Sequence, residues 1–140
     1  MDFVCDASNG KTWFRIETEA EAVAESEMMK HAVEKYFRRE RDKALAAWKP
    51  SQPESIERDI GRDAFVAKSM PLFLTLRAND GTALATAMLP PEGKDDPNFR
   101  MIIVGAANAD PYPLENEAIG LLGKHFALTL SRERCFPYGK

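Results

Sequence analysis

The sequence predicts a single α+β domain over residues 1–140, in which a largely antiparallel sheet of about five strands packs with helices in the order ββ-α-(α)-βββ-α. Three observations predict this class. Two turn dipeptides, Asn9-Gly10 and Asp80-Gly81, lie between segments of strand-forming residues. The stretch 19–48 contains neither glycine nor proline, which is typical of a long helix. Near the C-terminus, apolar residues recur around most of a helical circumference, which indicates a buried helix.

The first hairpin is expected over residues 2–17. Asn9-Gly10 can supply the positive φ angles of a two-residue type I′ turn, and that turn places Cys5 opposite Phe14. One face of the hairpin then becomes mostly apolar and is expected to face the core. Its members are Phe3, Cys5, Ala7, Thr12, Phe14 and Ile16. Val4 and Trp13 point the other way in this register.

One long helix is expected over residues 19–48. Thr18 and Glu21 have the spacing of a capping box at its start, and Pro50 ends it. An apolar stripe runs along it at helical spacing through Met29, Val33, Phe37, Ala44 and Trp48.

A second helical element is expected to begin at residues 51–53, because Ser51 and Glu54 repeat the capping-box spacing. Gly61 weakens this prediction, and residues 64–69 fit a short strand as well as a helix. The residues that recur at helical spacing are Ile56, Ile60, Ala64 and Ala67.

The second hairpin is expected over residues 71–89, with Asp80-Gly81 as its two-residue loop. This register places eight apolar residues on one face: Leu72, Leu74, Leu76, Ala78, Ala83, Ala85, Ala87 and Leu89. Phe73, Leu84 and Met88 share the opposite face with polar residues.

The rest of the chain predicts a loop, a strand and a helix. Residues 90–98 are polar and rich in proline, and they read as a loop. Residues 99–104 form an apolar run that favours a fifth strand buried on both faces. The last helix is expected to start at Asp110-Pro111 and to run to about Ser131.

The composition is that of an ordinary globular protein, with 44% hydrophobic and 29% charged residues. A formal net charge of −3 argues against a dedicated binder of nucleic acids or anionic membranes. No apolar run is long enough for a transmembrane helix, and the first residues have no signal-peptide pattern, so we expect a cytoplasmic protein. The two cysteines, Cys5 and Cys135, are expected to be reduced, with a disulfide as the alternative.

The second face of the predicted sheet is the main functional candidate. Helices on one side leave the other side uncovered, and the residues that would lie there are Val4, Trp13, Phe73, Leu84 and Met88. The long helix could cover this face, two copies could pair through it as a homodimer, or it could receive a partner or an apolar ligand. The leading hypothesis is a non-enzymatic module that self-associates or binds another protein through this face.

The alternative hypothesis is a small-molecule-binding protein or an enzyme. Its pocket would lie near the connection between the fifth strand and the last helix, residues 105–112, and would be lined by Asn108, Asp110, Tyr112 and His125. No nucleophile and base occur at catalytic spacing, so the sequence assigns no catalytic residue and favours a function without catalysis. We expect no metal and no cofactor, because neither histidine has a second ligand at a suitable spacing.

A third hypothesis concerns the basic residues Arg38, Arg39 and Arg41, which could contact phosphates. Their position in the second half of the long helix, after several glutamates, also complements the helix dipole. The second explanation is favoured over nucleic-acid binding.

Overall fold

The computed structural model describes residues 1–48 and 56–136, and within them it has an α+β fold, as predicted. The described strands form one sheet in sequence order: β1 (Asp2–Asp6), β2 (Thr12–Arg15), β3 (Leu72–Arg77), β4 (Ala83–Leu89), β5 (Met101–Val104) and β6 (Cys135–Phe136). Strands β1 to β5 are antiparallel, whereas β6 runs parallel to β5. The helices are α1 (Glu19–Met29), α2 (Val33–Ala47), α3 (Ile56–Ser69) and α4 (Tyr112–Phe126). Short 3-10 turns connect β1 to β2 (η1, Ser8–Gly10), β4 to β5 (η2, Pro91–Gly93) and β5 to α4 (η3, Ala106–Asn108).

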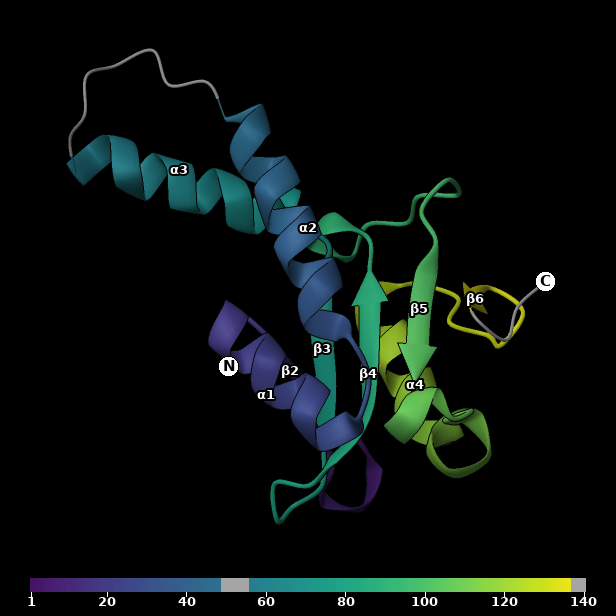
Figure 1. Cartoon of the computed structure of the whole chain (residues 1–140). Helices are drawn as coiled ribbons and strands as arrows, with labels where there is room; N and C mark the ends of the chain where they lie inside the picture. The colour runs from purple at the N-terminus through teal and green to yellow at the C-terminus, as the bar shows by residue number, and fades with distance from the viewer. Residues whose placement is uncertain (49–55, 137–140) are drawn as a thin grey trace.

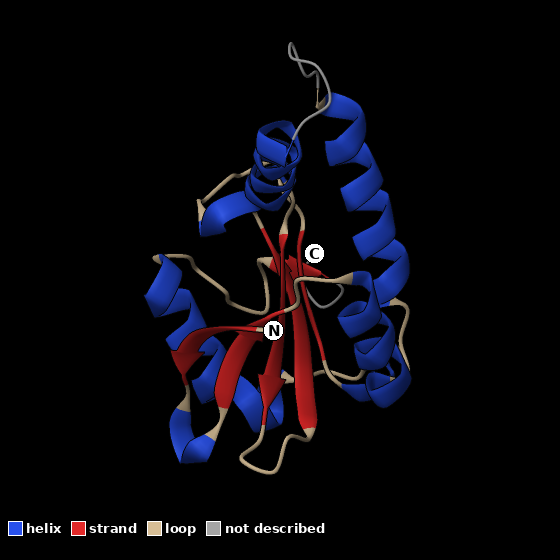
Figure 2. Ribbon diagram, turned by 90° about the vertical axis from the view of Figure 1, so that its left-hand side faces the viewer, coloured by secondary structure: helices blue, strands red, loops and turns tan. Residues whose placement is uncertain are grey.

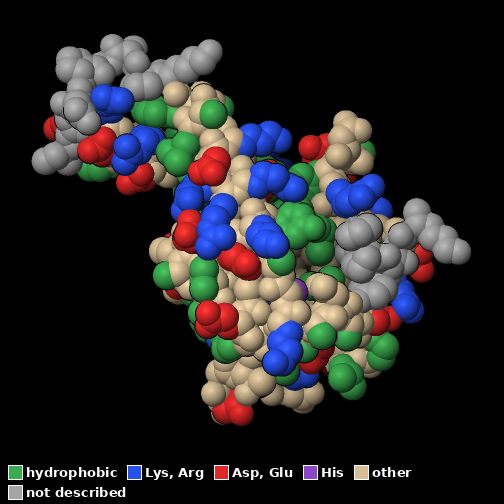
Figure 3. All heavy atoms as spheres, viewed as in Figure 1, with side chains coloured by type: hydrophobic (Ala, Val, Ile, Leu, Met, Phe, Trp, Pro, Cys, Tyr) green, Lys and Arg blue, Asp and Glu red, His purple; other side chains and the backbone are tan. Residues whose placement is uncertain are grey.

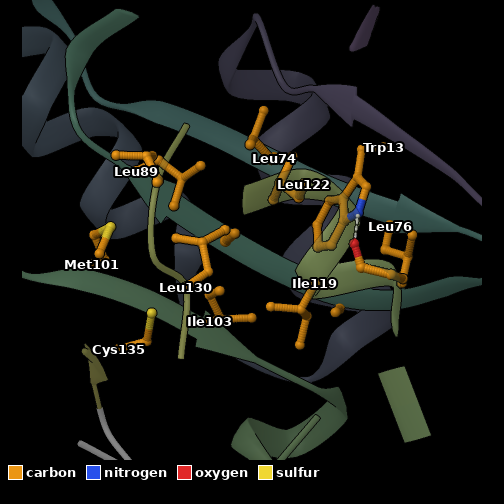
Figure 4. Close-up of a cluster of buried hydrophobic side chains, with 14 of the residues drawn as sticks. Trp13, Leu74, Leu76, Leu89, Met101, Ile103, Ile119, Leu122, Leu130 and Cys135 are labelled. Carbon is orange, nitrogen blue, oxygen red and sulfur yellow. Dashed lines mark hydrogen bonds between the residues drawn. The ribbon is translucent and has the colours of Figure 1, made fainter. Parts of the chain in front are cut away.

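Helices cover both faces of the sheet, which gives three layers (Figures 1 and 2). Helix α4 packs on one face in a core that includes Trp13, Leu74 and Ile119 (Figure 4). Helices α1 and α2 pack on the other face in a core that includes Phe37 and Phe73, whose rings meet edge to face at 5.3 Å. Of the explanations considered for the second face, cover by the chain's own helices is therefore the one that the fold bears out.

The first hairpin forms, but its register differs from the prediction. Asn9 and Gly10 have positive φ angles of 61° and 74°, yet the loop has three residues and is closed by a hydrogen bond from the Ala7 N–H to the Lys11 carbonyl, 2.8 Å. Cys5 consequently pairs with Trp13 instead of Phe14, and a bulge follows at Val4. The extra loop residue brings Cys5 to the same face as Trp13, and the bulge at Val4 then leaves Phe3 paired with Phe14. Trp13 is buried because β2 places it opposite Leu76, on the face that α4 covers, whereas Phe3 lies on the edge strand and is exposed.

The second hairpin keeps the predicted pairing of Leu72, Leu74 and Leu76 with Leu89, Ala87 and Ala85. Its loop also has three residues, because the Ala78 N–H donates to the Thr82 carbonyl at 2.8 Å and Gly81 has a φ of 90°. A β-bulge at Leu84 compensates for the extra loop residue, and Ala83 pairs with Arg77, so the predicted pair of Ala78 with Ala83 is wrong. Because this bulge lies next to the turn, the rest of the register is unaffected.

The predicted long helix is two helices. The capping box of Thr18 and Glu21 is confirmed at the start of α1. Lys30 then adopts the left-handed conformation with a φ of 54°, which ends α1, and α2 starts at Val33. We call residues 30–32 the α1–α2 hinge. The expected end at Pro50 and the second capping box at Ser51 lie outside the described residues.

Three further differences concern the second half of the chain. Residues 64–69 are helical, as the end of α3. Helix α4 ends at Phe126, before the predicted Ser131, because Ala127 is left-handed and the Leu128 N–H donates to the Gly123 carbonyl at 2.8 Å. The chain then turns back so that Leu128 and Leu130 join the core. Strand β6 was not predicted, since two residues are too few to show a pattern.

Two remaining expectations concern the thiols and the membrane. Cys5 and Cys135 are both free, the first partly buried and the second buried. Among the described helices, none combines the length and the apolar character that a bilayer crossing requires.

Candidate ligand-binding site

A hollow of about 260 Å³ opens on the face of the sheet that carries α1 and α2. Its walls come from the α1–α2 hinge and the start of α2 on one side, and from β3, β4, β5 and η3 on the other. The lining residues are His31, Ala32, Val33, Tyr36, Phe73, Thr86, Ala87, Met88, Ile102, Val104 and Asn108. Most of this wall is apolar, and the polar side chains gather around the hinge.

His31 is held in place by the hinge itself. Because Lys30 is left-handed, the chain reverses, and the His31 N–H donates to the Ser26 carbonyl at 3.3 Å. The Nδ1 atom of His31 accepts the Val33 N–H at 3.4 Å, at the first turn of α2. The Nε2 atom lies 2.8 Å from the Thr86 hydroxyl on β4. The imidazole thus connects the start of α2 to the sheet.

The neighbours of His31 fix its protonation state. The Thr86 hydroxyl donates its proton to Glu25 Oε2 at 2.5 Å, so towards His31 it acts as an acceptor. Nε2 must therefore carry a proton, and Nδ1, which accepts from the Val33 N–H, must not. His31 is a neutral imidazole with a defined tautomer, and neither nitrogen is left to act as a base.

Glu25 anchors this network in the core. Its side chain is fully buried, and its second oxygen, Oε1, accepts from Arg77 Nη2 at 2.7 Å. The Arg77 Nε donates to the Thr75 hydroxyl at 3.0 Å, and Thr75 pairs with Thr86 across the two strands. A buried carboxylate requires such partners, since an unpaired charge in the interior is costly. The floor beside the hollow is thus a satisfied polar network.

Burial lowers the pKa of His31 below its ordinary value of 6.5, although the nearby Glu25 and Glu34 carboxylates act in the opposite direction. Since the unfolded chain binds this proton more readily, the contribution of neutral His31 to stability is present above pH 6.5 and is lost as the pH falls below it. We expect the free energy of unfolding, measured in urea, to fall between pH 7.5 and pH 5.5.

The variant His31→Asn is the control for this prediction, because asparagine does not titrate in that range. Its unfolding free energy should change less over the same interval than that of the natural chain. An equal change in both proteins would mean that another group causes the pH dependence.

The residues of the predicted interaction surface do not form one surface. Phe73 and Met88 are buried and line the hollow. Trp13 lies on the opposite face, fully buried, where its Nε1 donates to the Ala118 carbonyl of α4 at 2.9 Å. Val4 and Leu84 are partly buried against the same α4 core. The expectation that all five share an exposed face is therefore corrected: β2 pairs with β3 so that Trp13 lies opposite Leu76, on the other face from Phe73. Val4 and Leu84 lie at bulges, which change the face of each.

The residues of the alternative pocket are also separated. Asn108 lines the hollow. Asp110 instead accepts the Tyr112 N–H at 3.1 Å and pairs with Arg132 at 2.5 Å. The Tyr112 hydroxyl donates to the Leu130 carbonyl at 3.0 Å, and burial raises the pKa of this hydroxyl. His125 is exposed, and its ring contacts that of Phe126. It lies about 20 Å along α4 from Tyr112. These four residues form no common pocket.

The sequence did not reveal His31, Tyr36 and the hydrogen-bond network around Glu25. One signal was present: Glu25 and Ser26 occupy the same helical stripe as Ala22 and Met29, which are buried. A carboxylate in an apolar stripe indicates a buried, paired group. The position of His31 depends on the helix break at Lys30. The sequence has no glycine or proline there that would indicate a break.

The three arginines of α2 are engaged with neighbouring groups. Arg38 and Arg41 both pair with Glu19, at 3.2 and 2.8 Å. Arg39 pairs with Glu40 and lies over the ring of Tyr36. In residues 1–48 and 56–136, no three His, Cys, Asp or Glu side chains come close enough together to hold a metal ion.

Comparison with known proteins adds no relative: neither a protein-family model, nor a curated protein, nor a solved structure matches this chain. The fold and the site alone therefore define its class, an α+β protein with a small apolar hollow between a helix hinge and the sheet.

Proposed function

We propose that this protein is a non-enzymatic binding module that takes a small apolar ligand in the hollow beneath the α1–α2 hinge. The observation that carries the proposal is the wall of the hollow, where Val33, Phe73, Met88, Ile102 and Val104 surround about 260 Å³ of space. Largely apolar concave sites with a few polar groups are the usual form of small-molecule sites. The tautomer of His31 supports binding rather than catalysis, because both ring nitrogens are already hydrogen-bonded.

The volume limits the size of the ligand. An apolar cavity of about 150 Å³ accommodates a benzene molecule. The hollow therefore suits one aromatic ring with a short chain, such as 3-phenylpropan-1-ol. For about ten non-hydrogen atoms, a dissociation constant on the order of 1 mM or lower is expected.

Methyl groups in the wall provide the test. On titration with 3-phenylpropan-1-ol, the methyl NMR signals of Val33, Met88, Ile102 and Val104 should shift together and saturate. Ile102 is only partly buried, so Ile102→Trp should fill the hollow from its rim and abolish the shifts without unfolding the protein. Leu114→Trp, at an exposed site on α4, is the matched control and should bind normally.

Two results would contradict the proposed site. If the shifts concentrate on methyl groups away from the hollow, or if Ile102→Trp binds as the natural chain does, the proposed site is wrong. The natural-chain titration keeps the test valid even if the tryptophan variant is unstable.

A second candidate function is self-association or binding of a protein partner through the outer side of α4. The observation that favours it is the exposure of two leucines one heptad apart, Leu114 at 86% and Leu121 at 36%. Light scattering should then give a mass that rises from 15.7 kDa with concentration, and Leu114→Ser should suppress the rise. A constant monomer mass would remove this candidate.

The free thiols of Cys5 and Cys135 support a reducing compartment such as the cytoplasm for either function.

A further inference from the structure

We propose that the natural ligand of the hollow is an apolar carboxylate, with its apolar part inside and its carboxylate at the mouth. This inference rests on the proposed function and deepens it by naming the chemical class of the ligand. It is carried by the charges of the two segments that border the hollow.

These bordering segments are residues 30–40 and residues 100–108. Together they carry five basic residues, Lys30, Lys35, Arg38, Arg39 and Arg100, against two acidic ones, Glu34 and Glu40. The chain as a whole has a formal net charge of −3. The border of the hollow thus has the opposite sign to the protein. Figure 3 shows Lys and Arg side chains gathered over α2, beside a patch of hydrophobic side chains.

The two acidic residues in these segments are engaged within the protein. Glu34 accepts the hydroxyl proton of Ser26 across the hinge. Glu40 pairs with Arg39 at 3.1 Å. The pairs Arg39–Glu40 and Arg38–Glu19 balance both arginines of α2 counted here, so on the α2 side the positive excess rests on Lys30 and Lys35 against Glu34.

Several of the cations lie close to the lining. The Arg39 guanidinium carbon is 4.9 Å from the ring centre of Tyr36, a lining residue, and Lys35 is the exposed neighbour of that tyrosine. On the opposite wall, Arg100 precedes Ile102 by two residues. Arg100 is exposed and directly precedes β5, the strand that carries the lining residues Ile102 and Val104. The cations thus flank the mouth from both walls.

The interior of the hollow does not suit the charged end. The His31 Nε2–H already donates to the Thr86 hydroxyl, and that hydroxyl donates to Glu25. The first N–H groups of α2 are also occupied, because Val33 donates to His31 and Glu34 donates to Ser26 at 3.2 Å. A carboxylate placed beside the hinge would find these donors engaged and would approach the buried Glu25. The charge of the ligand is therefore expected at the rim, where it is partly hydrated and screened by salt.

The test compares 3-phenylpropanoate with 3-phenylpropan-1-ol, which have the same apolar part and differ in charge. At low ionic strength the carboxylate should bind about fivefold more tightly than the alcohol, the size expected for two exposed charge contacts. In 0.5 M salt the difference should largely disappear, because the screening length falls well below 10 Å. The affinity of the alcohol should change little.

Two variants locate the effect. Lys35→Gln and Arg100→Gln should each weaken the carboxylate by about two- to threefold and leave the alcohol unchanged. Lys124→Gln, at an exposed position on α4, is the control and should affect neither ligand. If both ligands bind equally at every ionic strength, the carboxylate assignment is overturned and the apolar site remains. If neither ligand binds in the hollow, the proposed function itself fails, and the assignment with it.

Discussion

Replacement of Arg77 by glutamine is expected to lower the free energy of unfolding by about 3–5 kcal/mol. Arg77 is the cation that pairs with the fully buried Glu25 at 2.7 Å, and its own side chain is only 12% exposed. Without it, the carboxylate keeps one hydrogen bond, from Thr86, and remains buried without a counter-charge. The measurement is urea denaturation at pH 7.5 followed by circular dichroism.

Two controls separate this effect from a general loss of charge. Arg38→Gln removes an ion pair whose side chains are 44% and 37% exposed, and should cost at most about 1 kcal/mol. The double variant Glu25→Gln, Arg77→Gln removes the uncompensated charge and should recover part of the loss. An Arg77→Gln protein within 1 kcal/mol of the natural chain would contradict the buried network on which the floor of the hollow depends.

Replacement of Trp13 by alanine is expected to cost a similar amount, about 3–5 kcal/mol. The indole is fully buried between the sheet and α4, and its N–H donates to the Ala118 carbonyl. The substitution leaves a large cavity in the centre of the α4 core and removes this hydrogen bond. Chemical denaturation of the variant, compared with the natural chain, measures the loss.

Phe3→Ala is the matched control for the register of the first hairpin. The sequence predicts Phe3 in the core and Trp13 outside it, whereas in the structure Trp13 is fully buried and 57% of Phe3 is exposed. We therefore expect Phe3→Ala to cost less than about 1 kcal/mol. If Phe3→Ala proves the more costly of the two, the burial of Trp13 and the exposure of Phe3 shown by the structure are wrong.

The two hairpins explain how far the sequence predicted the fold. Both dipeptides mark real turns, so the strands, their antiparallel pairing and the α+β class follow from local pattern. The length of each loop does not follow from local pattern, because the same dipeptide can end a three-residue loop. In the second hairpin a bulge beside the turn restores the register, so the prediction is right for five of the pairs. In the first hairpin the shift persists, so Cys5 pairs with Trp13 and Phe3 with Phe14. The burial of Trp13 depends on its position opposite Leu76, on the face that α4 covers, which no local pattern shows.

The helix break and the hollow could not be predicted from local sequence pattern, for a different reason. Lys30 adopts a left-handed conformation that its residue type does not favour, and tertiary contacts of Ser26, His31 and Thr86 hold the turn in place. The hollow then forms between segments about 55 to 70 residues apart in the sequence, such as His31 with Thr86 and Val33 with Ile102. Phe73, Met88 and Asn108 were among the candidates from the sequence and line the hollow, but the sequence placed them in two different sites, and their meeting place depends on this break.

The most direct measurement is a crystal structure of the protein in complex with 3-phenylpropanoate. We expect the phenyl ring between Val33, Met88 and Ile102, with the carboxylate at the mouth on the side of Lys35 or Arg100. Density for the ligand only at other surfaces, with the hollow filled by repacked side chains of α2, would contradict it.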